Sequence, residues 1–398
     1  DEPGSTTTVA GGAVPSGSNP ATNGQPFAGS VVTIAGTVRA TAADRLQSAW
    51  QQFEADSGID LQYIEVDSSL DFLTLAQGAG TPDLALVQQP TLAQLVEAGE
   101  VVPLDLLTRV ESDAMPGAAE MGSIDGTFYA PPFDINPGSV VWYSPAAFAS
   151  RGYEVPTTYA DMLALSESIA DDGAASWCVG AESGLATGWP LTYWVDELVV
   201  RTGGTDAYDR WISHDLAFSD PTVTDAIDDA GAILLRDDFV LNGVASIPST
   251  SFQEAGFPLL DEACFMHHQG SFYRDLFPEG TTFGPDGDIN AFYFPVVAVD
   301  DPRPMVANGS FIAALVDQPE VAAVAQFLTS AEYADERMAL GGWFSPNTGV
   351  DASVMTDPLD RAIAQMLLDC DLYRQHATDL MPAQVGAGTF WSEMTAWV

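Results

Sequence analysis

Aromatic and amide side chains are the residues of this sequence whose types best suit binding chemistry. The chain has 9 Trp, and several of them stand near glycine, proline or polar neighbours in predicted loops: Trp142, Trp177, Trp189, Trp194, Trp343 and Trp391. An aromatic face stacks on the C–H face of a sugar ring, while Asp, Asn and Gln form paired hydrogen bonds to hydroxyl groups. A single Trp is more often simply part of a core. Their coincidence with predicted loops favours the walls of a carbohydrate pocket.

Signals for catalysis or metal binding are weak. The sequence lacks a G-x-S-x-G turn, a P-loop, a G-x-G-x-x-G turn after a strand and an H-E-x-x-H helix. Only 4 His are present, and the adjacent His267 and His268 would point to opposite faces of a strand. Asp286, Asp288 and Asn290 have the opening spacing of a calcium loop, but its turn glycine and closing Glu are missing, which favours a plain turn. Chance pairs among 56 acidic residues leave glycoside hydrolysis open.

The charge balance restricts the classes of partner. The 398 residues carry 12 basic side chains, all of them Arg, against 56 acidic ones, for a formal net charge of −44. Such a field repels phosphate backbones and anionic lipid, so nucleic-acid binding and membrane docking through a basic patch are excluded. A neutral or cationic partner fits better. The acidity also suits adaptation to high salt, where screening relieves self-repulsion.

The N-terminal segment 1–30 reads as a flexible tether. It is rich in Ser, Thr, Gly, Pro and Ala and has almost no apolar periodicity. It lacks the basic and apolar regions of a signal peptide, and no window of the chain approaches the roughly 18 apolar residues of a spanning helix. We therefore expect an extracellular or periplasmic protein, anchored to a membrane by a lipid on a residue before Asp1.

The chain has 3 Cys, and their spacings fit no zinc pattern. In an oxidising compartment, one disulfide with one remaining thiol is the expected arrangement. Cys178 and Cys264 are the favoured pair, which leaves Cys370 free. Three buried thiols that act as small apolar groups are the alternative.

Alternating strands and helices follow the tether. The pattern comprises a strand at 31–35, a helix that ends at Gly58, a strand at 59–66, a helix at 70–79 and a strand at 84–87. Such a βαβαβ order predicts a mostly parallel sheet with ligands beyond the carboxyl ends of its strands. Thr37, residues 67–71, Gln88 and Gln89 should therefore meet at one rim.

A proline-rich break at 131–138 separates this region from a second one. Strands are expected at 139–143 and 264–268, a mixed region at 292–315, and helices at 161–169, from Pro190, and at 222–235, 319–328, 331–340, 359–368 and through Trp391. Because 398 residues exceed the roughly 250–300 that one core accommodates, two lobes are expected.

Distinctive stretches occur along the chain, namely SVVWYSP at 139–145, WCVGAESG at 177–184, ATGWP at 186–190, CFMHHQGSF at 264–272, GGWFSPN at 341–347 and DLMPAQVGAGTFW at 379–391. In this order they resemble the extracellular solute-binding proteins of ABC importers, within the carbohydrate branch that includes maltose-binding and α-glucoside-binding proteins. The resemblance covers about 31–397 and looks closest to the α-glucoside-binding subgroup.

The resemblance implies an α/β fold of the periplasmic-binding-protein-like type II, with two α/β lobes, a hinge and an interlobe ligand cleft. It places the first lobe at 31–132 and 263–304 and the second at 140–262 and 311–398. The hinge segments are expected at about 133–139 and 305–310.

The resemblance also implies ligand contacts. Thr37 and Arg39 resemble cleft positions of the first lobe, Asn136 a hinge residue that contacts sugar hydroxyls, and Phe272 and Trp391 stacking aromatics. An amide at Asn136, where maltose-binding proteins carry a carboxylate, and Phe272 in place of Trp favour a smaller ligand than long maltodextrins. The full set of expected ligand-binding residues is Thr37, Arg39, Asp71, Gln88, Gln89, Asp134, Asn136, Trp189, Gln269, Phe272, Asn308, Trp343 and Trp391.

The expected function is that of a receptor that closes on a neutral di- or oligosaccharide, an α-glucoside by resemblance, and delivers it to membrane permease subunits. We expect a monomer without cofactor, metal or catalytic residue. One alternative is an enzyme that acts on glycosides. The other is a receptor for a cationic solute such as a polyamine or peptide, which the negative field would attract.

Overall fold

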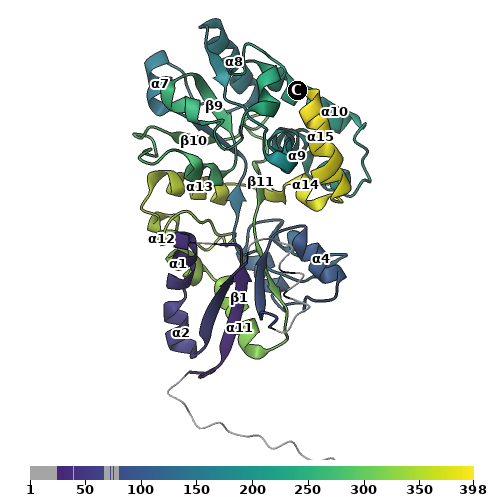
Figure 1. Ribbon diagram of the computed structural model, residues 1–398, viewed down its shortest axis with the longest axis vertical. Coiled ribbons are helices and arrows are strands. Elements are labelled where there is room, and N and C mark those ends of the chain that lie inside the picture. Colours follow the sequence, from purple (N-terminus) through teal and green to yellow (C-terminus); the bar gives the residue numbers. More distant parts are fainter. Residues whose placement is uncertain (1–24, 39, 67–71, 73–74, 76–79) are drawn as a thin grey trace, which may run out of the picture.

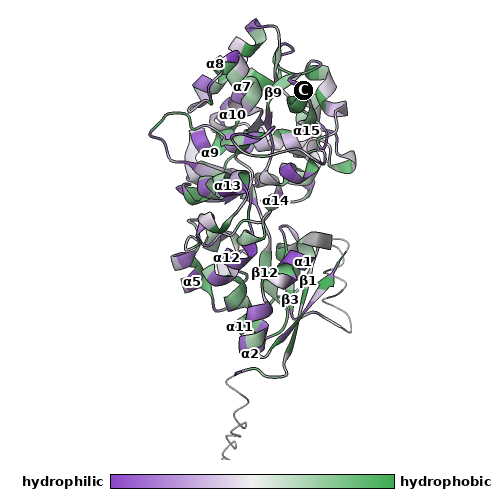
Figure 2. Ribbon diagram, turned by 90° about the vertical axis from the view of Figure 1, so that its left-hand side faces the viewer, coloured by the Kyte–Doolittle hydropathy of each residue, from purple (hydrophilic) through white to green (hydrophobic). Residues whose placement is uncertain are grey.

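The computed structural model describes residues 25–38, 40–66, 72, 75 and 80–398 and folds them into two lobes joined by a narrow waist (Figures 1 and 2). Most of the expected tether, most of the expected helix at 70–79, Arg39 and Asp71 lie outside these residues. No helix within the described ranges is both long enough and apolar enough to cross a membrane.

The first lobe is built on a four-stranded sheet. In spatial order its strands are β12 (Phe311–Ala314), β3 (Leu84–Val87), β1 (Val31–Gly36) and β2 (Asp60–Glu65). β1 runs parallel to β2 and β3, whereas β12 is antiparallel to β3. All of β3 is buried, as a strand covered on both faces requires. The three predicted strands of the βαβαβ pattern are thus confirmed.

Helices and one hairpin surround this sheet, and α11 packs along β1 and β12 (Figure 2). The elements are α1 (Ala40–Ser48), α2 (Gln51–Ser57), α4 (Thr91–Glu97), α5 (Leu107–Asp113), α6 (Ala118–Met121), β4 (Ser123–Ile124), β5 (Thr127–Phe128), α11 (Pro319–Leu328) and α12 (Ala331–Ala339). The predicted helices at 319–328 and 331–340 are confirmed.

The second lobe has a four-stranded sheet of its own. In spatial order its strands are β10 (Asn290–Tyr293), β7 (Val140–Tyr143), β9 (Cys264–His268) and β8 (Ala175–Trp177). Only β8 and β9 are parallel to each other. The helices are α7 (Pro145–Arg151), α8 (Tyr159–Asp171), α9 (Trp189–Ile212), α10 (Pro221–Leu234), α13 (Pro358–Leu368), α14 (Ala377–Leu380) and α15 (Trp391–Trp397).

Short turns of other helix types complete the second lobe and its connections. They are η1 (Gly184–Ala186), η2 (Val244–Ser249), η3 (Phe257–Asp261), η4 (Ser271–Leu276), η5 (Ala352–Val354) and the π-helical η6 (Gln384–Phe390). Local sequence explains where several helices begin. Thr158 and Asp161 form a reciprocal capping box at α8, and Ser144 caps α7 ahead of Pro145.

The long helix α9 forms the centre of the second lobe. Its residues from Pro190 to Val200 are all buried, so this part of the helix has no polar face toward water. Farther along, Gly204 adopts a left-handed φ of 76° that interrupts the regular helix, a conformation that suits glycine. The predicted helix from Pro190 is therefore confirmed, with a kink that the apolar pattern did not indicate.

The expected distribution of the later segments between the lobes is wrong. β9 and β10, which fall within 263–304, pair with β7 and β8 in the sheet of the second lobe. β12, which falls within 311–398, pairs with β3 in the first lobe. The physical reason is strand pairing between segments far apart in sequence, which local patterns do not reveal.

A separate three-stranded sheet forms the waist, here called the hinge sheet. Its spatial order is β13 (Leu372–Gln375), β11 (Pro304–Asn308) and β6 (Asn136–Pro137). β11 is parallel to β13 and antiparallel to β6. The segments 133–139 and 305–310, expected as the hinge, both run through this sheet on their way between the lobes (Figure 1).

Candidate functional site

The carboxyl end of β1 points toward the hinge sheet (Figure 1). Thr37 directly follows β1 and Gln88 directly follows β3, and both side chains are exposed. Gln89, the next residue, is buried, and its Oε1 accepts a hydrogen bond from the Ala93 amide at 3.2 Å in the first turn of α4. The two adjacent glutamines therefore have different surroundings.

Aromatic rings gather beside β6, at one edge of the hinge sheet. Trp189 at the start of α9 lies 5.2 Å from Phe252, 5.6 Å from Tyr193 and 6.1 Å from Phe272, measured between ring centroids. Phe272 belongs to η4, which packs against β6. Trp189 and Phe272 are both partly exposed, so their rings remain accessible to a ligand. We call this region the aromatic edge.

Two amides stand between the lobes on neighbouring strands of the hinge sheet. Asn136 on β6 pairs in register with Asn308 on β11, and both side chains are partly exposed. The Tyr193 hydroxyl donates to Asn308 Oδ1 at 3.3 Å, and Asn308 also hydrogen-bonds to Asp379. The structure therefore brings Asn136, Asn308, Trp189 and Phe272, all expected from the sequence, into one region.

Other expected residues already have partners in the structure. Asp134 Oδ1 accepts the Ser310 amide at 2.6 Å, so this carboxylate joins two crossing segments, and burial raises its pKa. Gln269 is buried, and its Oε1 accepts the Gly270 amide. Trp343 packs in the first lobe, with its ring centroid 5.4 Å from Phe133.

The expectation that loop-adjacent tryptophans form pocket walls is wrong for Trp142, Trp177 and Trp194. Their exposed fractions are 0%, 0% and 2%, and they belong to the core. Each lies on a strand or on the buried part of α9, where neighbouring elements cover it. Trp391 differs from them, because it is partly exposed while its indole Nε1 is buried without a hydrogen-bond partner. Its backbone carbonyl approaches Gly188, next to Trp189.

A groove of about 950 Å³ opens between the lobes at the β13 edge of the hinge sheet. Its first wall comes from α4, α6 and the β4–β5 hairpin, and its second from the end of α9, β13, α14 and η6. Five carboxylates line it: Glu97, Glu120 and Asp125 from the first lobe, and Asp209 and Asp379 from the second. We call it the acidic groove. Of the expected site residues that the structure describes, only Gln89 lines it.

Sequence reasoning missed the charged residues of this groove. Arg374 pairs with Asp209 through Nε at 2.7 Å and Nη2 at 2.9 Å, and its Nη1 donates to the Tyr373 carbonyl. Burial raises the pKa of Asp379 to about 7, although the hydrogen bond from Asn308 acts in the opposite direction. Asp379 opens the sequence stretch at 379–391, which was the one available signal for it.

The buried histidines are held as neutral rings. Burial lowers the pKa of His267 to about 4 and that of His268 to about 3. Their Nδ1 atoms contact different backbone carbonyls, Cys178 at 2.8 Å and Val140 at 2.9 Å, so they do not face a common ion. In the described part of the chain, no group of three or more His, Cys, Asp or Glu side chains could hold a metal.

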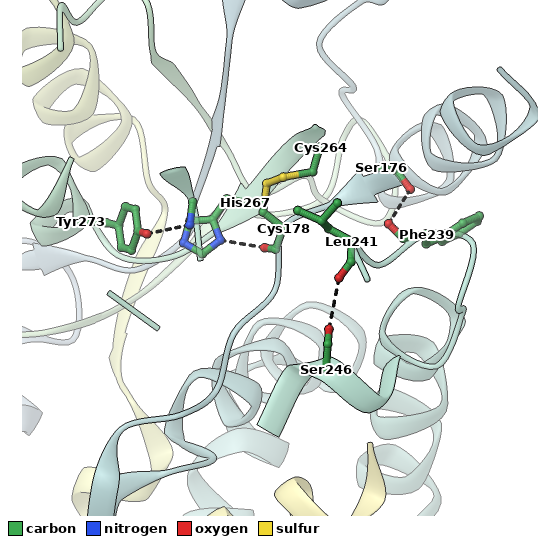
Figure 3. The surroundings of a disulfide bond; sticks show 9 residues. Ser176, Cys178, Phe239, Leu241, Ser246, Cys264, His267 and Tyr273 are labelled. Carbon is green, nitrogen blue, oxygen red and sulfur yellow. Dashed lines mark hydrogen bonds between the residues drawn. A yellow bond between two sulfur atoms is a disulfide. The ribbon is translucent and has the colours of Figure 1, made fainter. Parts of the chain in front are cut away.

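A disulfide joins Cys178 and Cys264, as expected (Figure 3), and Cys370 is free. The bond links the residue after β8 to the first residue of β9, the strand that leads into Gln269 and η4. Nearby, the Tyr273 hydroxyl accepts the Gly256 amide at 2.7 Å, which ties the start of η3 to η4. The disulfide therefore fixes the strands behind the aromatic edge.

Comparisons with known proteins place these features in context. The profile of the family described as bacterial extracellular solute-binding protein matches residues 39–335. The osmoprotective compounds-binding protein GgtB of Synechocystis sp. is 33% identical over 374 residues, which cover 92% of this chain and 88% of that protein. The alpha-glucosides-binding periplasmic protein AglE of Rhizobium meliloti is 33% identical over 390 residues, 94% of this chain and 85% of that protein.

Solved structures share the architecture at lower identity. The bacterial solute receptor AcbH aligns with a TM-score of 0.74 and 19% identity, over 92% of this chain and 96% of that one. The apo form of RafE from Streptococcus pneumoniae aligns with a TM-score of 0.71 and 17% identity, over 92% and 97%. These likenesses confirm the expected two-lobed α/β fold.

Proposed function

Because the chain belongs to the bacterial extracellular solute-binding protein family, whose members bind solutes and do not catalyse reactions, we propose that it is the sugar receptor of an ABC importer. It takes up a neutral di- or oligosaccharide of the α-glucoside class between its lobes and delivers it to permease subunits. It works outside the cytoplasm as a monomer, held to the membrane by a lipid that precedes Asp1. Mass spectrometry of the native N-terminus tests the anchor.

One observation carries the choice of a sugar, namely the partly exposed rings of Trp189 and Phe272 beside the hinge amides Asn136 and Asn308. Rings offer a face for sugar C–H groups, and amides both donate to and accept from hydroxyls without a charge. A ligand that touches both lobes favours the closed state by its differential affinity for the two states. Hydroxyls left without a partner would cost about 1–3 kcal/mol each, which provides epimer selectivity.

The 33% identity to AglE over nearly the whole chain supports the α-glucoside class. The equal identity to GgtB adds osmoprotective compounds to the candidate ligands. AcbH is described as preferring β-D-galactopyranose, but a likeness at 19% identity shows a shared fold only and does not indicate the same sugar ligand. Asn136 and Phe272 favour a ligand smaller than a long maltodextrin. In the proposed site, Thr37, Arg39, Asp71, Gln88 and Trp391 complete the contacts.

A thermal-shift panel followed by calorimetry tests the proposal. Trehalose, sucrose and maltose represent α-glucosides, cellobiose a β-glucoside, melibiose an α-galactoside and glycine betaine a non-sugar osmolyte. A ligand present at a hundred times its Kd should add about 2.7 kcal/mol to the unfolding free energy. Stabilisation by an α-glucoside supports the proposal, and stabilisation by cellobiose, melibiose or betaine alone contradicts it.

The acidic groove favours a second candidate, a receptor for a cationic solute. Its five carboxylates would attract a polyamine, and the Arg374 charge is already balanced by Asp209. Spermidine in the same panel separates the two candidates. Stabilisation by spermidine at low micromolar concentration, without any response to sugars, would favour this second function.

A further inference from the structure

Phe272 reaches the aromatic edge from η4, a 3₁₀ turn of 6 residues. A 3₁₀ turn has poorer hydrogen-bond geometry than an α-helix, so contacts with other elements decide where its side chains lie. Tyr273 supplies one such contact, because it is buried and its hydroxyl donates to the Gln253 carbonyl at 3.0 Å. The position of the Phe272 ring therefore depends on what holds the rest of η4.

Arg274 ties η4 to the start of α13. Its Nη2 donates to Asp357, the N-cap residue of α13, and its Nη1 donates to Asp360 Oδ2 at 3.1 Å. Its guanidinium also lies over the Phe283 ring, 4.9 Å from the centroid. The planar guanidinium carries several donors in a fixed arrangement, so one Arg side chain can bind two carboxylates at once, which a Lys ammonium does less well. Arg274 therefore fixes η4 against α13.

Asp360 extends this contact to the first lobe. It is buried, and its Oδ2 also accepts the Gly342 amide at 3.0 Å. Gly341 and Gly342 follow α12 and have left-handed φ values of 79° and 65°, which suit glycine. The Gly341 carbonyl accepts Arg337 Nη1 at 3.1 Å, which holds the glycine pair on the first lobe. We call the contacts of Arg274, through Asp360 to this glycine pair, the clasp; α12 and α13, which it joins, lie one above the other beside the waist (Figure 1).

The stretch that follows the glycine pair reaches the hinge sheet. The Phe344 carbonyl, two residues after the pair, accepts the Ile135 amide at 3.0 Å. Ile135 directly precedes Asn136 of β6, one of the two hinge amides. The clasp therefore connects the turn that carries Phe272 with the strand that carries Asn136.

We propose that Arg274 is a positioning residue of the sugar site, which holds the Phe272 ring in place relative to the Asn136 amide. This inference rests on the proposed function. A sugar that stacks on the ring and hydrogen-bonds to the amide needs a fixed spacing between them, and a displacement of about 1 Å weakens such a site. Arg274 touches no ligand in this role, so it affects the sugar Kd only through the ring that it holds.

Fluorine NMR of the ligand-free protein tests whether Arg274 holds the ring. 4-Fluorophenylalanine is incorporated at position 272, and its line is recorded in the otherwise wild-type chain and in two variants. Arg274→Gln removes the clasp and should shift or split the line. Arg274→Lys keeps the charge without the planar group and should give a smaller shift, so the test does not depend on the folding of a single variant.

Arg361→Gln is the matched control, because it removes the same charge from α13. The Arg361 guanidinium donates to the Met355 carbonyl through Nε at 3.1 Å and Nη2 at 2.6 Å, and not to the clasp. This variant should leave the fluorine line unchanged. An unchanged line in Arg274→Gln, or an equal shift in Arg361→Gln, would overturn the proposal.

Once a sugar is identified, a double-mutant cycle measured by calorimetry separates positioning from a general structural role. Arg274→Gln should weaken the sugar Kd about tenfold in the wild-type background but no more than about twofold in a Phe272→Ala background, where the ring is already gone. Arg361→Gln should keep the wild-type Kd. Equal losses in both backgrounds would make Arg274 a structural residue and overturn its positioning role. If no sugar binds, the proposed function fails, while the fluorine spectra still decide whether Arg274 holds the ring.

Discussion

The two edges of the hinge sheet lie between the same lobes but differ in chemistry. The aromatic edge offers Trp189 and Phe272 beside the amides Asn136 and Asn308. The acidic groove offers five carboxylates and a balanced Arg374. At the first edge, a neutral polyol finds aromatic stacking faces beside uncharged hydrogen-bond partners. The acidic groove is therefore not the proposed sugar site.

The disulfide behind the aromatic edge should give the largest effect on stability. Cys178 and Cys264 are 86 residues apart in sequence, and their link restricts the unfolded chain. We expect the double variant Cys178→Ala and Cys264→Ala to lose about 3–4 kcal/mol of unfolding free energy. Chemical denaturation measures this loss, with Cys370→Ala as the control that keeps the disulfide. Equal stability of the double variant and wild type would show that the aromatic edge does not depend on this link.

The second largest effect is expected on the sugar Kd, when an aromatic contact of the proposed site is removed. Trp391→Ala should weaken sugar binding about a hundredfold, the loss typical of a central aromatic contact. Its indole Nε1 lacks a partner in the ligand-free structure, so the substitution breaks no side-chain hydrogen bond of the fold. Trp397→Ala on the same helix is the matched control, because that ring packs against Gly231 in the second lobe. Calorimetry that finds Trp391→Ala unchanged in Kd would remove this residue from the site.

A smaller effect is expected on the pH dependence of the unfolding free energy, through Asp379 of the acidic groove. Burial raises the pKa of Asp379 to about 7 from its ordinary 3.8, so the folded chain keeps a proton that the unfolded chain loses. This carboxyl therefore makes stability fall as the pH rises from about 4 to 7. Asp379→Asn keeps an acceptor for Asn308 and removes the titration. Its unfolding free energy should fall by about 2–3 kcal/mol less than that of wild type between pH 5 and pH 8.

Glu197 provides the internal reference for this comparison. Burial also raises its pKa to about 7, although it pairs with Arg201, and it titrates in both proteins. Denaturation curves collected across the pH range therefore keep a common slope, and the difference between the curves belongs to Asp379. Parallel curves for the variant and wild type would mean that Asp379 is hydrated and does not titrate near neutral pH.

Local patterns predicted what depends on neighbouring residues. The apolar run at 84–87 became a fully buried strand, and the periodic pattern at 319–328 became α11 with the same bounds. The disulfide followed from the number of cysteines and an oxidising compartment. These features need no knowledge of which segments pair across the chain.

What could not be predicted depends on distant segments. Strand 264–268 belongs to the second lobe and not, as its position in the sequence predicts, to the first. Its partners β7 and β8 lie about a hundred residues earlier in the chain, beyond the reach of local sequence patterns. Trp142 and Trp177 belong to the core and not, as their sequence neighbours predict, to pocket walls. Sequence neighbours do not reveal what covers a ring. The acidic groove combines α4, the β4–β5 hairpin and α14, and no single stretch indicated it.

The smallest effects should appear at two adjacent glutamines that separate the edges. Gln88 is exposed after β3, whereas Gln89 is buried, lines the acidic groove and accepts the Ala93 amide of α4. Gln88→Ala should weaken sugar binding about fivefold, the loss of one hydrogen bond, without a change in stability. Gln89→Ala should cost about 1 kcal/mol of unfolding free energy, because a first-turn amide of α4 loses its acceptor, while the sugar Kd stays the same. Calorimetry and denaturation on both variants test the pair. The reverse result would place the sugar on the groove side of Gln89, and the aromatic edge would then lose its assigned role.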